Sequence, residues 1–382
     1  MTLPRALDVL VVGTGPAGAV IAASLAPHCR VALAGREPGE DRVIGESLPS
    51  AAGVVLAELG LWASFMAQGH LEAPTRLSLW GGDEPVRQDA IDDPRGAGWH
   101  LDRRRFDALL RQAAVEGGAR LVQPAELRRL AHDAARAPYP WRCRIDTADG
   151  PWEPDCKVLV DATGRSARIV RHAGIDVVRG DGLACVQTWL AAAPGAPTGA
   201  TLVEATPDGW WYGASLPDGS RVVAWHCDGD LDAIRRCRTA DDLLAQARRT
   251  TLIAEHCAGG RPLEPLRAAP ARSQWPASAA GADWIAVGDA SLAFDPLASQ
   301  GLLHALATGR EGARAVLAHL HGDTAALPAW APWQREIARA YRANLAQCYA
   351  MEQRWPDAAF WRRRHDKFLR AEKQADRLVH SS

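Results

Sequence analysis

The sequence predicts an α/β protein in which a parallel sheet is assembled from non-contiguous segments, a mostly antiparallel domain is inserted between them, and a helical tail follows. Two observations predict the parallel sheet. The apolar run Asp8–Val12 leads directly into a glycine turn, Gly13–Gly18 (GTGPAG), and Val31–Ala34 follows the helix that this turn opens. The inserted domain is predicted by residues 177–278, where alternating runs are punctuated by Trp, Gly and Pro.

The composition is that of a folded globular protein. The 382 residues are 47% hydrophobic and 23% charged, which excludes a disordered or fibrous chain. Lysine and arginine number 44 against 45 aspartates and glutamates, so the net charge of -1 supplies no field that would attract nucleic acid. No apolar run reaches the roughly 18 residues that a membrane span needs. We therefore expect neither a nucleic-acid partner nor a membrane span.

The cysteines indicate the compartment. The chain has 8 of them and no C-x-x-C pair, so neither a zinc site nor a disulfide framework is indicated, and no metal is expected. Reduced thiols that pack as small apolar side chains are typical of a cytoplasmic protein, which is the predicted location.

The elements follow in order along the chain. The β-α-β unit comprises a strand at Asp8–Val12, a helix at Ala17–Ala26 and a strand at Val31–Ala34. Apolar residues at three- and four-residue intervals predict helices over Ser50–Gly69 and Asp102–Glu116. The further predicted elements are a hairpin over 141–160, strands at 201–204, 210–216 and 221–226, a helix at 240–255, a strand at 284–289 and helices from Gln300 onward. The expected domains are 1–176 with 279–325, the inserted 177–278, and a C-terminal helical region 326–382.

The glycine turn predicts a pyrophosphate site. It follows a strand and opens a helix, a context in which backbone N–H groups and the helix N-terminus hold an anion. The acidic residue that usually binds a ribose hydroxyl falls at the end of the second strand, and that position is Gly35. Ribose binding would then depend on Arg36, on Glu37, or on neither.

Two more strand ends carry an aspartate among small residues. Asp161 opens the segment Asp161–Arg165 after one strand, and Asp289 follows Gly288 after another. Because the carboxyl ends of parallel strands share one edge, the three loops are expected to form one crevice. The segment Asp295–Leu302 then leads into a helix whose N-terminus suits an anion.

These motifs together resemble the FAD-dependent monooxygenases of the para-hydroxybenzoate-hydroxylase fold, especially the branch that includes the tryptophan halogenases. The resemblance also rests on the segments Gly45–Pro49 and Asp102–Asp107 and spans residues 8 to about 310. It implies a Rossmann-like FAD-binding domain with an inserted antiparallel substrate domain and a C-terminal helical tail. The residues expected to bind FAD are Gly13, Gly15, Pro16, Ala17, Gly18, Arg36, Ser47, Arg103, Asp161, Gly164, Gly288, Asp289, Pro296, Gln300, Gly301 and Leu302.

Three chemistries compete within that family. Halogenases of this branch need a lysine in the substrate tunnel and a Gly-Trp-x-Trp-x-Ile-Pro motif, whereas no lysine precedes Lys157 here, and residues 209–215 read GWWYGAS. A prenyl reductase would share the fold, but nothing marks a lipid-binding surface. Hydroxylation remains, in which reduced flavin captures molecular oxygen as a C4a-hydroperoxide and the protein positions the aromatic ring and excludes water.

The C-terminal segment 349–364, together with Trp210–Tyr212 and the segment 215–219, is similar to flavoproteins that mature peptide-derived quinone cofactors such as cysteine tryptophylquinone. Those enzymes oxygenate a tryptophan of a partner protein. Two interpretations of the segment stay open: a structural helix packed by Trp355, Phe360 and Trp361 with a solvated face at Arg362–Arg364, or a docking surface for an acidic partner.

The expected function is therefore that of an FAD-dependent monooxygenase acting on an indole-type ring, on a protein-borne tryptophan or a small aromatic molecule. NADH or a separate flavin reductase would supply electrons, and a flavin-binding maturation chaperone is the non-enzymatic alternative. Glu46 is the first candidate for proton acceptor, ahead of His100, His226 and His304. The candidate substrate pocket is formed by Trp210, Trp211 and Tyr212.

Overall fold

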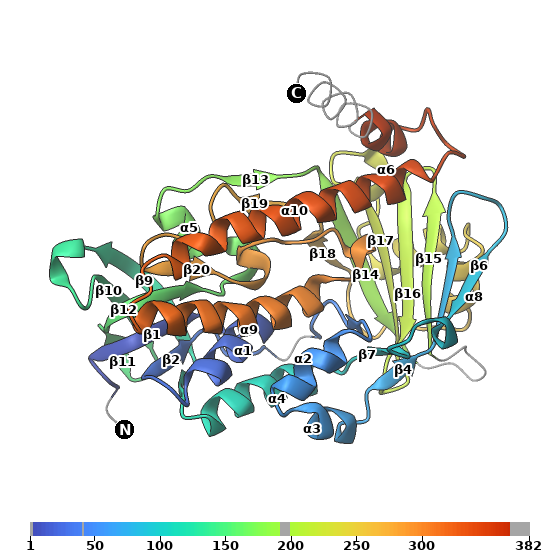
Figure 1. Ribbon diagram of the computed structural model, residues 1–382. Coiled ribbons are helices and arrows are strands. Elements are labelled where there is room, and N and C mark those ends of the chain that lie inside the picture. Colours follow the sequence, from blue (N-terminus) through green and yellow to red (C-terminus); the bar gives the residue numbers. More distant parts are fainter. Residues whose placement is uncertain (1–2, 40–41, 192–198, 367–382) are drawn as a thin grey trace. The chain divides into compact units, whose positions relative to one another are not determined.

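The computed structural model describes residues 3–39, 42–191 and 199–366 (Figure 1). The chain divides into two units, each built from three separated segments. The first unit contains residues 1–69, 103–180 and 273–338, and the second contains residues 70–102, 181–272 and 339–382.

The first unit is built on an 8-stranded sheet whose centre is parallel. Strands run in the order β8-β2-β1-β12, and β20 pairs with β12. The strands of this unit are β1 (Ala6–Val12), β2 (Val31–Ala34), β3 (Ser47–Leu48), β8 (Arg120–Val122), β9 (Ala125–His132), β10 (Trp141–Thr147), β11 (Gly150–Trp152), β12 (Asp155–Asp161), β13 (Val177–Arg179), β19 (Gln274–Pro276) and β20 (Trp284–Ala286).

The register of this sheet brings three strand ends to one edge. Val12 at the end of β1 pairs with Asp161 at the end of β12, and Asp161 in turn pairs with Ala286 at the end of β20. Valine and leucine fill the buried interiors of β1 and β12, as expected of parallel strands covered on both faces. The predicted crevice-forming loops therefore start at the same level of the sheet.

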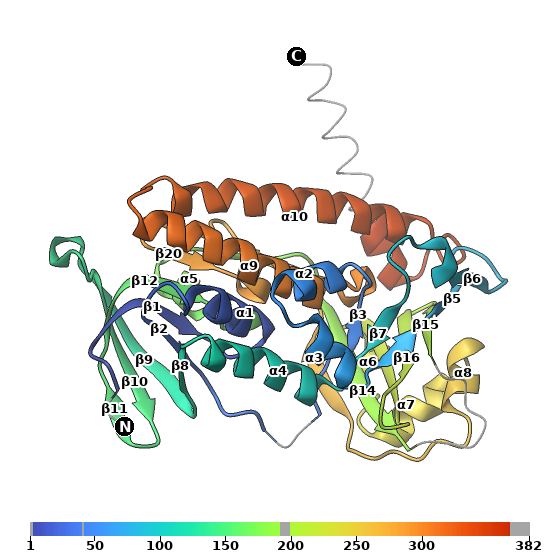
Figure 2. The ribbon, with the colours of Figure 1, turned by 60° about the horizontal axis from the view of Figure 1, so that its bottom comes forward.

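Helix packing in the first unit depends on small residues. Helices α1 (Pro16–Leu25) and α9 (Gly301–Leu320) lie side by side, and α4 (Arg103–Glu116) also contacts α1 (Figure 2). A Cβ atom at Gly309 would approach Val20 Cβ to 2.8 Å, so glycine allows the helices to meet closely. The other helices of this unit are α2 (Ala52–Glu58), α3 (Trp62–Ala67) and α5 (Arg168–His172), and α10 (Ala326–Ala350) crosses the division between the units.

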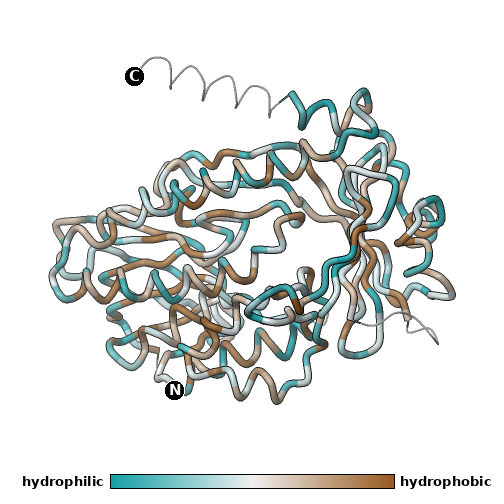
Figure 3. Tube along the Cα trace, turned by 45° about the vertical axis from the view of Figure 1, so that its right-hand side comes forward, coloured by the Kyte–Doolittle hydropathy of each residue, from teal (hydrophilic) through white to brown (hydrophobic). Residues whose placement is uncertain are grey.

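The second unit is built on a 7-stranded sheet in the order β18-β14-β17-β16-β15-β5-β6. Its pairs are antiparallel except β15 with β5. Hydrophobic residues dominate its central strands (Figure 3). The elements of this unit are β4 (Leu71–Ala73), β5 (Thr75–Leu79), β6 (Val86–Asp89), β7 (Gly98–His100), β14 (Leu183–Leu190), β15 (Ala200–Thr206), β16 (Gly209–Ser215), β17 (Arg221–Asp228), β18 (Arg267–Pro270), α6 (Asp232–Arg235), α7 (Ala240–Ala247) and α8 (Leu252–Cys257).

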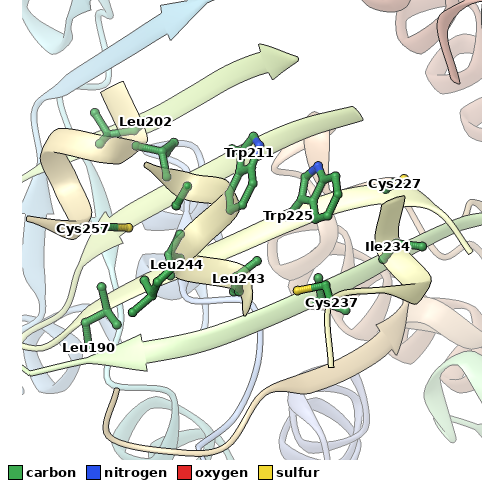
Figure 4. Packing of buried hydrophobic residues seen from close by; sticks show 14 residues of the cluster. Leu190, Leu202, Trp211, Trp225, Cys227, Ile234, Cys237, Leu243, Leu244 and Cys257 are labelled. Carbon is green, nitrogen blue, oxygen red and sulfur yellow. The ribbon is translucent and has the colours of Figure 1, made fainter. Parts of the chain in front are cut away.

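Helices α6, α7 and α8 cover one face of the second sheet. Trp211 and Trp225 stack there with ring centroids 5.3 Å apart and contact the hydrophobic core that contains Leu243 and Leu244 (Figure 4). The buried carboxylate of Glu204 accepts backbone N–H bonds at the N-terminus of α8, which orients this helix against the sheet.

The C-terminal segment 349–366 packs within the second unit. Trp210 donates its indole N–H to the Tyr349 hydroxyl over 3.0 Å, and Trp361 donates its own to the Thr206 carbonyl over 2.8 Å. Phe360 and Trp361 are fully buried. The segment therefore has the structural role predicted for its aromatic residues.

The arginines of this segment form the expected solvated face only in part, because Arg362 and Arg363 are exposed whereas Arg364 is not. Arg364 is buried and bonds Asp228 through two nitrogens, at 2.8 and 3.3 Å, with its guanidinium carbon 3.5 Å from the Phe360 ring centroid. Arg363 bonds both Asp228 and Asp230. Arg363 and Arg364 are thus used in ion pairs within the chain, and Arg362 donates to the Asp357 carbonyl over 3.4 Å.

The predicted fold class is confirmed, with three local differences. Residues 50–69 form two short helices, because Gly60 adopts a left-handed φ of +71° between them. The predicted helix over 240–255 is likewise split into α7 and α8. Residues 70–102 and 339–366 group with the second unit.

Loss of the Asp228 carboxylate should destabilise the second unit strongly. Asp228→Ala leaves the Arg364 cation buried without its main counterion, so we expect a loss of about 3–5 kcal/mol in the free energy of unfolding. Asp230→Ala removes a half-exposed partner of Arg363 and should cost less than about 1 kcal/mol. Urea unfolding followed by tryptophan fluorescence measures both, and equal losses would contradict the buried-pair interpretation.

Candidate functional site

The glycine turn after β1 is packed directly against the end of β12. A Cβ atom at Gly13, where φ is +116°, would lie 2.0 Å from the Ala162 carbonyl oxygen, and one at Gly18 would lie 1.9 Å from the Gly13 carbonyl oxygen. Both positions therefore require glycine. At Gly15, by contrast, no atom of the described residues lies within 4 Å of the added Cβ. The middle glycine thus borders open space at the start of α1.

Two helix N-termini in the first unit are open to an anion. Helix α1 begins after Gly15 with Pro16 at its first position, and α9 begins after Gln300. Within the described part of the chain, neither helix has a side-chain cap or an acidic residue in its first turn. Their first N–H groups and positive dipole ends therefore remain available for negatively charged groups.

Asp161 organises its loop through hydrogen bonds. Its buried carboxylate accepts from the Thr163 hydroxyl over 2.6 Å and from the backbone N–H groups of Thr163, Ile169 and Val170 over 2.8–3.0 Å. Burial raises the pKa of Asp161, while these bonds oppose the rise. We interpret Asp161 as the residue that shapes the loop carrying Gly164.

The loop after β20 meets the start of α1. Gly288 has a φ of +58°, and a Cβ added there would come 2.7 Å from Ala17 Cβ. Asp289 lies next, with its carboxylate 3.7 Å from the Arg165 guanidinium, and Arg165 also donates to the Phe294 carbonyl over 2.8 Å. The structure therefore brings together the loops of the three predicted strand ends within the first unit.

Arg103 holds the segment that precedes Ser47. One of its terminal nitrogens donates to the carbonyls of Ile44 and Gly45 over 2.7 and 2.6 Å, and the guanidinium also pairs with Asp107 over 3.1 Å. Glu46 is buried in this segment. Arg103 thus fixes the backbone that presents Glu46 and Ser47.

The three candidate histidines are buried and uncharged near neutral pH. Burial lowers the pKa of His100 and of His304 to about 4 and that of His226 to about 3. His304 lies 3.3 Å from the Ser291 hydroxyl, and His100 lies 2.8 Å from the Thr201 hydroxyl. Such low pKa values make them weak bases, so the structure does not favour any of them over Glu46.

Strand alternation divides the predicted substrate residues between two faces of the second sheet. Trp211 points into the helix-covered core, whereas Trp210 and Tyr212 point to the opposite face. Trp210 is stacked on His226, with centroids 3.7 Å apart, and is bonded to Tyr349. Of the three residues, only Tyr212 packs against the smaller hydrophobic cluster of that opposite face.

Sequence reasoning missed Gln187 and Trp189, which share the face of Tyr212. Val186 and Leu190 of β14 belong to the helix-covered core, so alternation places Gln187 and Trp189 on the other side. Gln187 is buried, and its Nε2 has no hydrogen-bond partner among the described residues. The same holds for Nδ1 of His226. Buried donors without a partner are rare in folded proteins, and a bound ligand is one way to satisfy them.

The comparisons with known proteins identify the family. Residues 6–323 match the model of the FAD binding domain family. The chain belongs to this family of flavoproteins. Its relative LodB of Marinomonas mediterranea, whose name describes an FAD-dependent oxidoreductase, is 30% identical over 366 residues, which cover 94% of this chain and 96% of LodB. The predictions of the family resemblance and of a flavin-dependent oxidoreductase are confirmed.

Other similar proteins include two halogenases and one dihydroxylase. The tryptophan 2-halogenase of Chondromyces crocatus is 25% identical over 343 residues, which cover 85% of this chain and 63% of that protein. The structure of the myxobacterial chondrochloren halogenase CndH aligns with a TM-score of 0.83 at 25% identity, covering 99% of this chain and 90% of that one. The peptidyl tryptophan dihydroxylase QhpG aligns with a TM-score of 0.72 at 24% identity, covering 94% and 78%.

The residues present fit FAD. The open space at Gly15 and the uncapped start of α1 suit the pyrophosphate of this flavoprotein's cofactor. The uncapped start of α9, at Gln300 and Gly301, suits an anionic reduced flavin ring. In the described ranges, no helix is long and apolar enough to cross a membrane, and no cluster of three or more His, Cys, Asp or Glu side chains could hold a metal ion.

Two glycine substitutions in one turn should separate cofactor binding from folding. Gly15→Ala places a methyl group where no protein atom lies, so the apoprotein should keep its melting temperature while FAD affinity falls at least about tenfold. Gly18→Ala forces a clash with the Gly13 carbonyl and should lower the melting temperature of the apoprotein itself. Thermal melts and flavin-fluorescence titrations distinguish these effects; unchanged FAD affinity in Gly15→Ala would refute the pyrophosphate assignment.

Acid should destabilise the protein between pH 6.5 and about 4. His100 has a pKa of about 4 in the folded chain against 6.5 ordinarily, so the unfolded chain binds the proton first as the pH falls. The stability that neutral His100 provides is present above pH 6.5 and is lost as the pH approaches 4. Replacement of His100 by glutamine should weaken the pH dependence of the free energy of unfolding, measured by urea unfolding between pH 4 and 6.5. An unchanged pH dependence in this variant would contradict the prediction.

Proposed function

We propose that the protein is an FAD-dependent monooxygenase that hydroxylates an indole-type ring, and that its substrate is a tryptophan carried by a partner protein. The observation that carries the proposal is the face of the second sheet shared by Tyr212, Trp189 and Gln187. It combines aromatic and small side chains with a buried amide donor that no described residue satisfies. Such a surface suits a flat aromatic ring attached to a polar group.

The reaction balances with the cofactors that the family implies. One atom of molecular oxygen enters a C–H bond of the ring as a hydroxyl group, and the other atom leaves as water. When bound, FAD would supply the oxygen-activating chemistry, and its reduced form would be the source of the two electrons and two protons that the balance requires. NADH or a separate flavin reductase would restore the reduced state.

Residues of this chain have distinct roles in the proposal. Ala214 and Ala224 are the small neighbours of Tyr212 on the same side of the sheet, where the ring would bind. Gln187 Nε2 would donate a hydrogen bond to a carbonyl of the substrate. In the first unit, Glu46, held by the segment that Arg103 fixes, is the candidate proton acceptor of the reaction.

One solved structure of the same fold supports a protein-borne substrate. QhpG is described as a peptidyl tryptophan dihydroxylase essential for tryptophylquinone cofactor biogenesis, and it shares the fold along 94% of this chain. Small-molecule hydroxylation and a chaperone role without turnover are the alternatives that the experiment below separates.

Halogenation is the second candidate, because several relatives are halogenases. The lysine that such enzymes need in the substrate tunnel is not provided by Lys157. Its ammonium group pairs with Asp8 at 2.9 Å, and it lies four residues before the carboxyl end of β12, about 13 Å along the strand from Asp161. The other lysines of the sequence, Lys367 and Lys373, lie outside the described residues.

Isotope labelling tests the proposed reaction. FAD-loaded protein, a reducing system, chloride, bromide and heavy-isotope dioxygen are incubated with tryptophan-containing proteins or with free tryptophan and indole, and the products are analysed by mass spectrometry. We expect one labelled oxygen atom per hydroxylation and faster turnover on a protein-borne tryptophan. A halogenated product would favour the second candidate, and flavin oxidation that yields only hydrogen peroxide with every substrate would refute the proposal.

Variants assign the substrate face. Gln187→Leu removes the buried donor at similar volume and should lower kcat/KM about tenfold without changing FAD affinity. Gln88→Leu places the same change on the exposed edge strand β6 of the same sheet and should leave kcat/KM unchanged. Glu46→Gln should lower kcat in folded, FAD-loaded protein. If all three variants keep the activity of the natural chain, neither Gln187 nor Glu46 takes part in the reaction.

A further inference from the structure

The end of β2 lacks the acidic side chain that usually binds the ribose of the adenosine half of a dinucleotide. Gly35 stands there, buried, with an ordinary backbone conformation. A Cβ atom at this position would lie 2.9 Å from Thr14 Cγ2 and 3.0 Å from Thr14 Oγ1. The Thr14 side chain therefore occupies the space that a glutamate at position 35 would need, which excludes the usual arrangement in this chain.

Gln123 lies at the same level on the neighbouring strand. Ala34 pairs with Val122 in the parallel register of β2 and β8, so the residues that follow, Gly35 and Gln123, leave the sheet edge side by side. Backbone bonds keep the two segments together there: Gly35 donates to the Val122 carbonyl over 3.2 Å, and Ala125 donates to the Gly35 carbonyl over 2.8 Å. A side chain at position 123 therefore reaches the region at the end of β2 that a side chain at position 35 would otherwise occupy.

The orientation of the Gln123 amide follows from its partners. Its Nε2 lies 2.8 Å from the Arg36 carbonyl oxygen and 2.8 Å from Thr14 Oγ1. A carbonyl oxygen only accepts, so the group that faces it must be the NH₂ donor. Both N–H groups of the amide are then used inside the protein, and the carbonyl oxygen Oε1 is directed away from the Arg36 carbonyl as an acceptor.

We propose that Gln123 binds the adenosine ribose of FAD, with its side-chain carbonyl accepting a hydrogen bond from a ribose hydroxyl in place of the missing carboxylate. The Thr14 hydroxyl, which accepts from Gln123, holds the amide in position. This arrangement connects the glycine turn, the end of β2 and the end of β8 in one hydrogen-bonded group. The inference concerns cofactor binding alone and does not depend on the substrate of the reaction.

Binding measurements on the apoprotein test the proposal. Gln123→Ala should weaken FAD and ADP about 3- to 10-fold, the usual effect of one neutral hydrogen bond, and leave FMN unchanged because FMN lacks the adenosine. Gln112→Ala, an exposed glutamine on α4 that bonds Glu116, is the matched control and should alter none of these affinities. Flavin-fluorescence titration and ADP competition provide the dissociation constants without any turnover.

Deoxy analogues of ADP distinguish direct contact from loosening of the turn. The natural chain should bind ADP more tightly than 2′-deoxy-ADP or 3′-deoxy-ADP, and Gln123→Ala should lose this discrimination. Adding Thr14→Gly with Gly35→Glu to that variant should restore it. Discrimination that persists in Gln123→Ala, or equal weakening of FAD, ADP and FMN, would overturn the proposal.

Discussion

The close contact between the glycine turn and the end of β12 is the constraint on which the first unit depends. The backbone of Gly13 lies so close to the Ala162 carbonyl that no side chain would fit between them, and Gly18 lies equally close to the Gly13 carbonyl. This contact places the N-terminus of α1 at the edge of the sheet where three strands end. Gly288 then brings the loop after β20 against Ala17. A cofactor site follows from backbone packing, before any charged side chain contributes.

Buried polar groups set the remaining geometry. In the first unit Asp161 ties its loop to the start of α5, and Arg103 ties the segment at Gly45 to α4. In the second unit Glu204 holds α8, and Asp228 holds the C-terminal segment through Arg364. Each buried carboxylate has several donors, so each is compensated for its desolvation. The satisfied groups support structure, whereas Gln187 Nε2 is a buried donor without a partner among the described residues.

Local patterns predicted most of the fold, because a strand, a glycine turn and a helix are encoded within a few consecutive residues. Contacts between distant residues were not readable in this way. Arg364 looked solvated in a basic run, but its partner Asp228 lies 136 residues away. Gly35 showed that the usual acidic ribose ligand is missing. Gln123 could not be found in the same way, because the strand β8 that brings it beside Gly35 is too short to give a periodic sequence pattern. The face of the second sheet to which Trp210 and Trp211 each point could be assigned only from the strand register of that sheet.

Retention of FAD is the most direct measurement of the central claim, that the first unit binds this dinucleotide at the shared edge of its parallel strands. The purified chain is loaded with FAD, desalted and examined by visible absorption, with flavin and protein quantified separately. One retained FAD per chain, and none when FMN replaces FAD, is the expected result. A colourless protein after FAD loading, or equal retention of FMN, would contradict the claim.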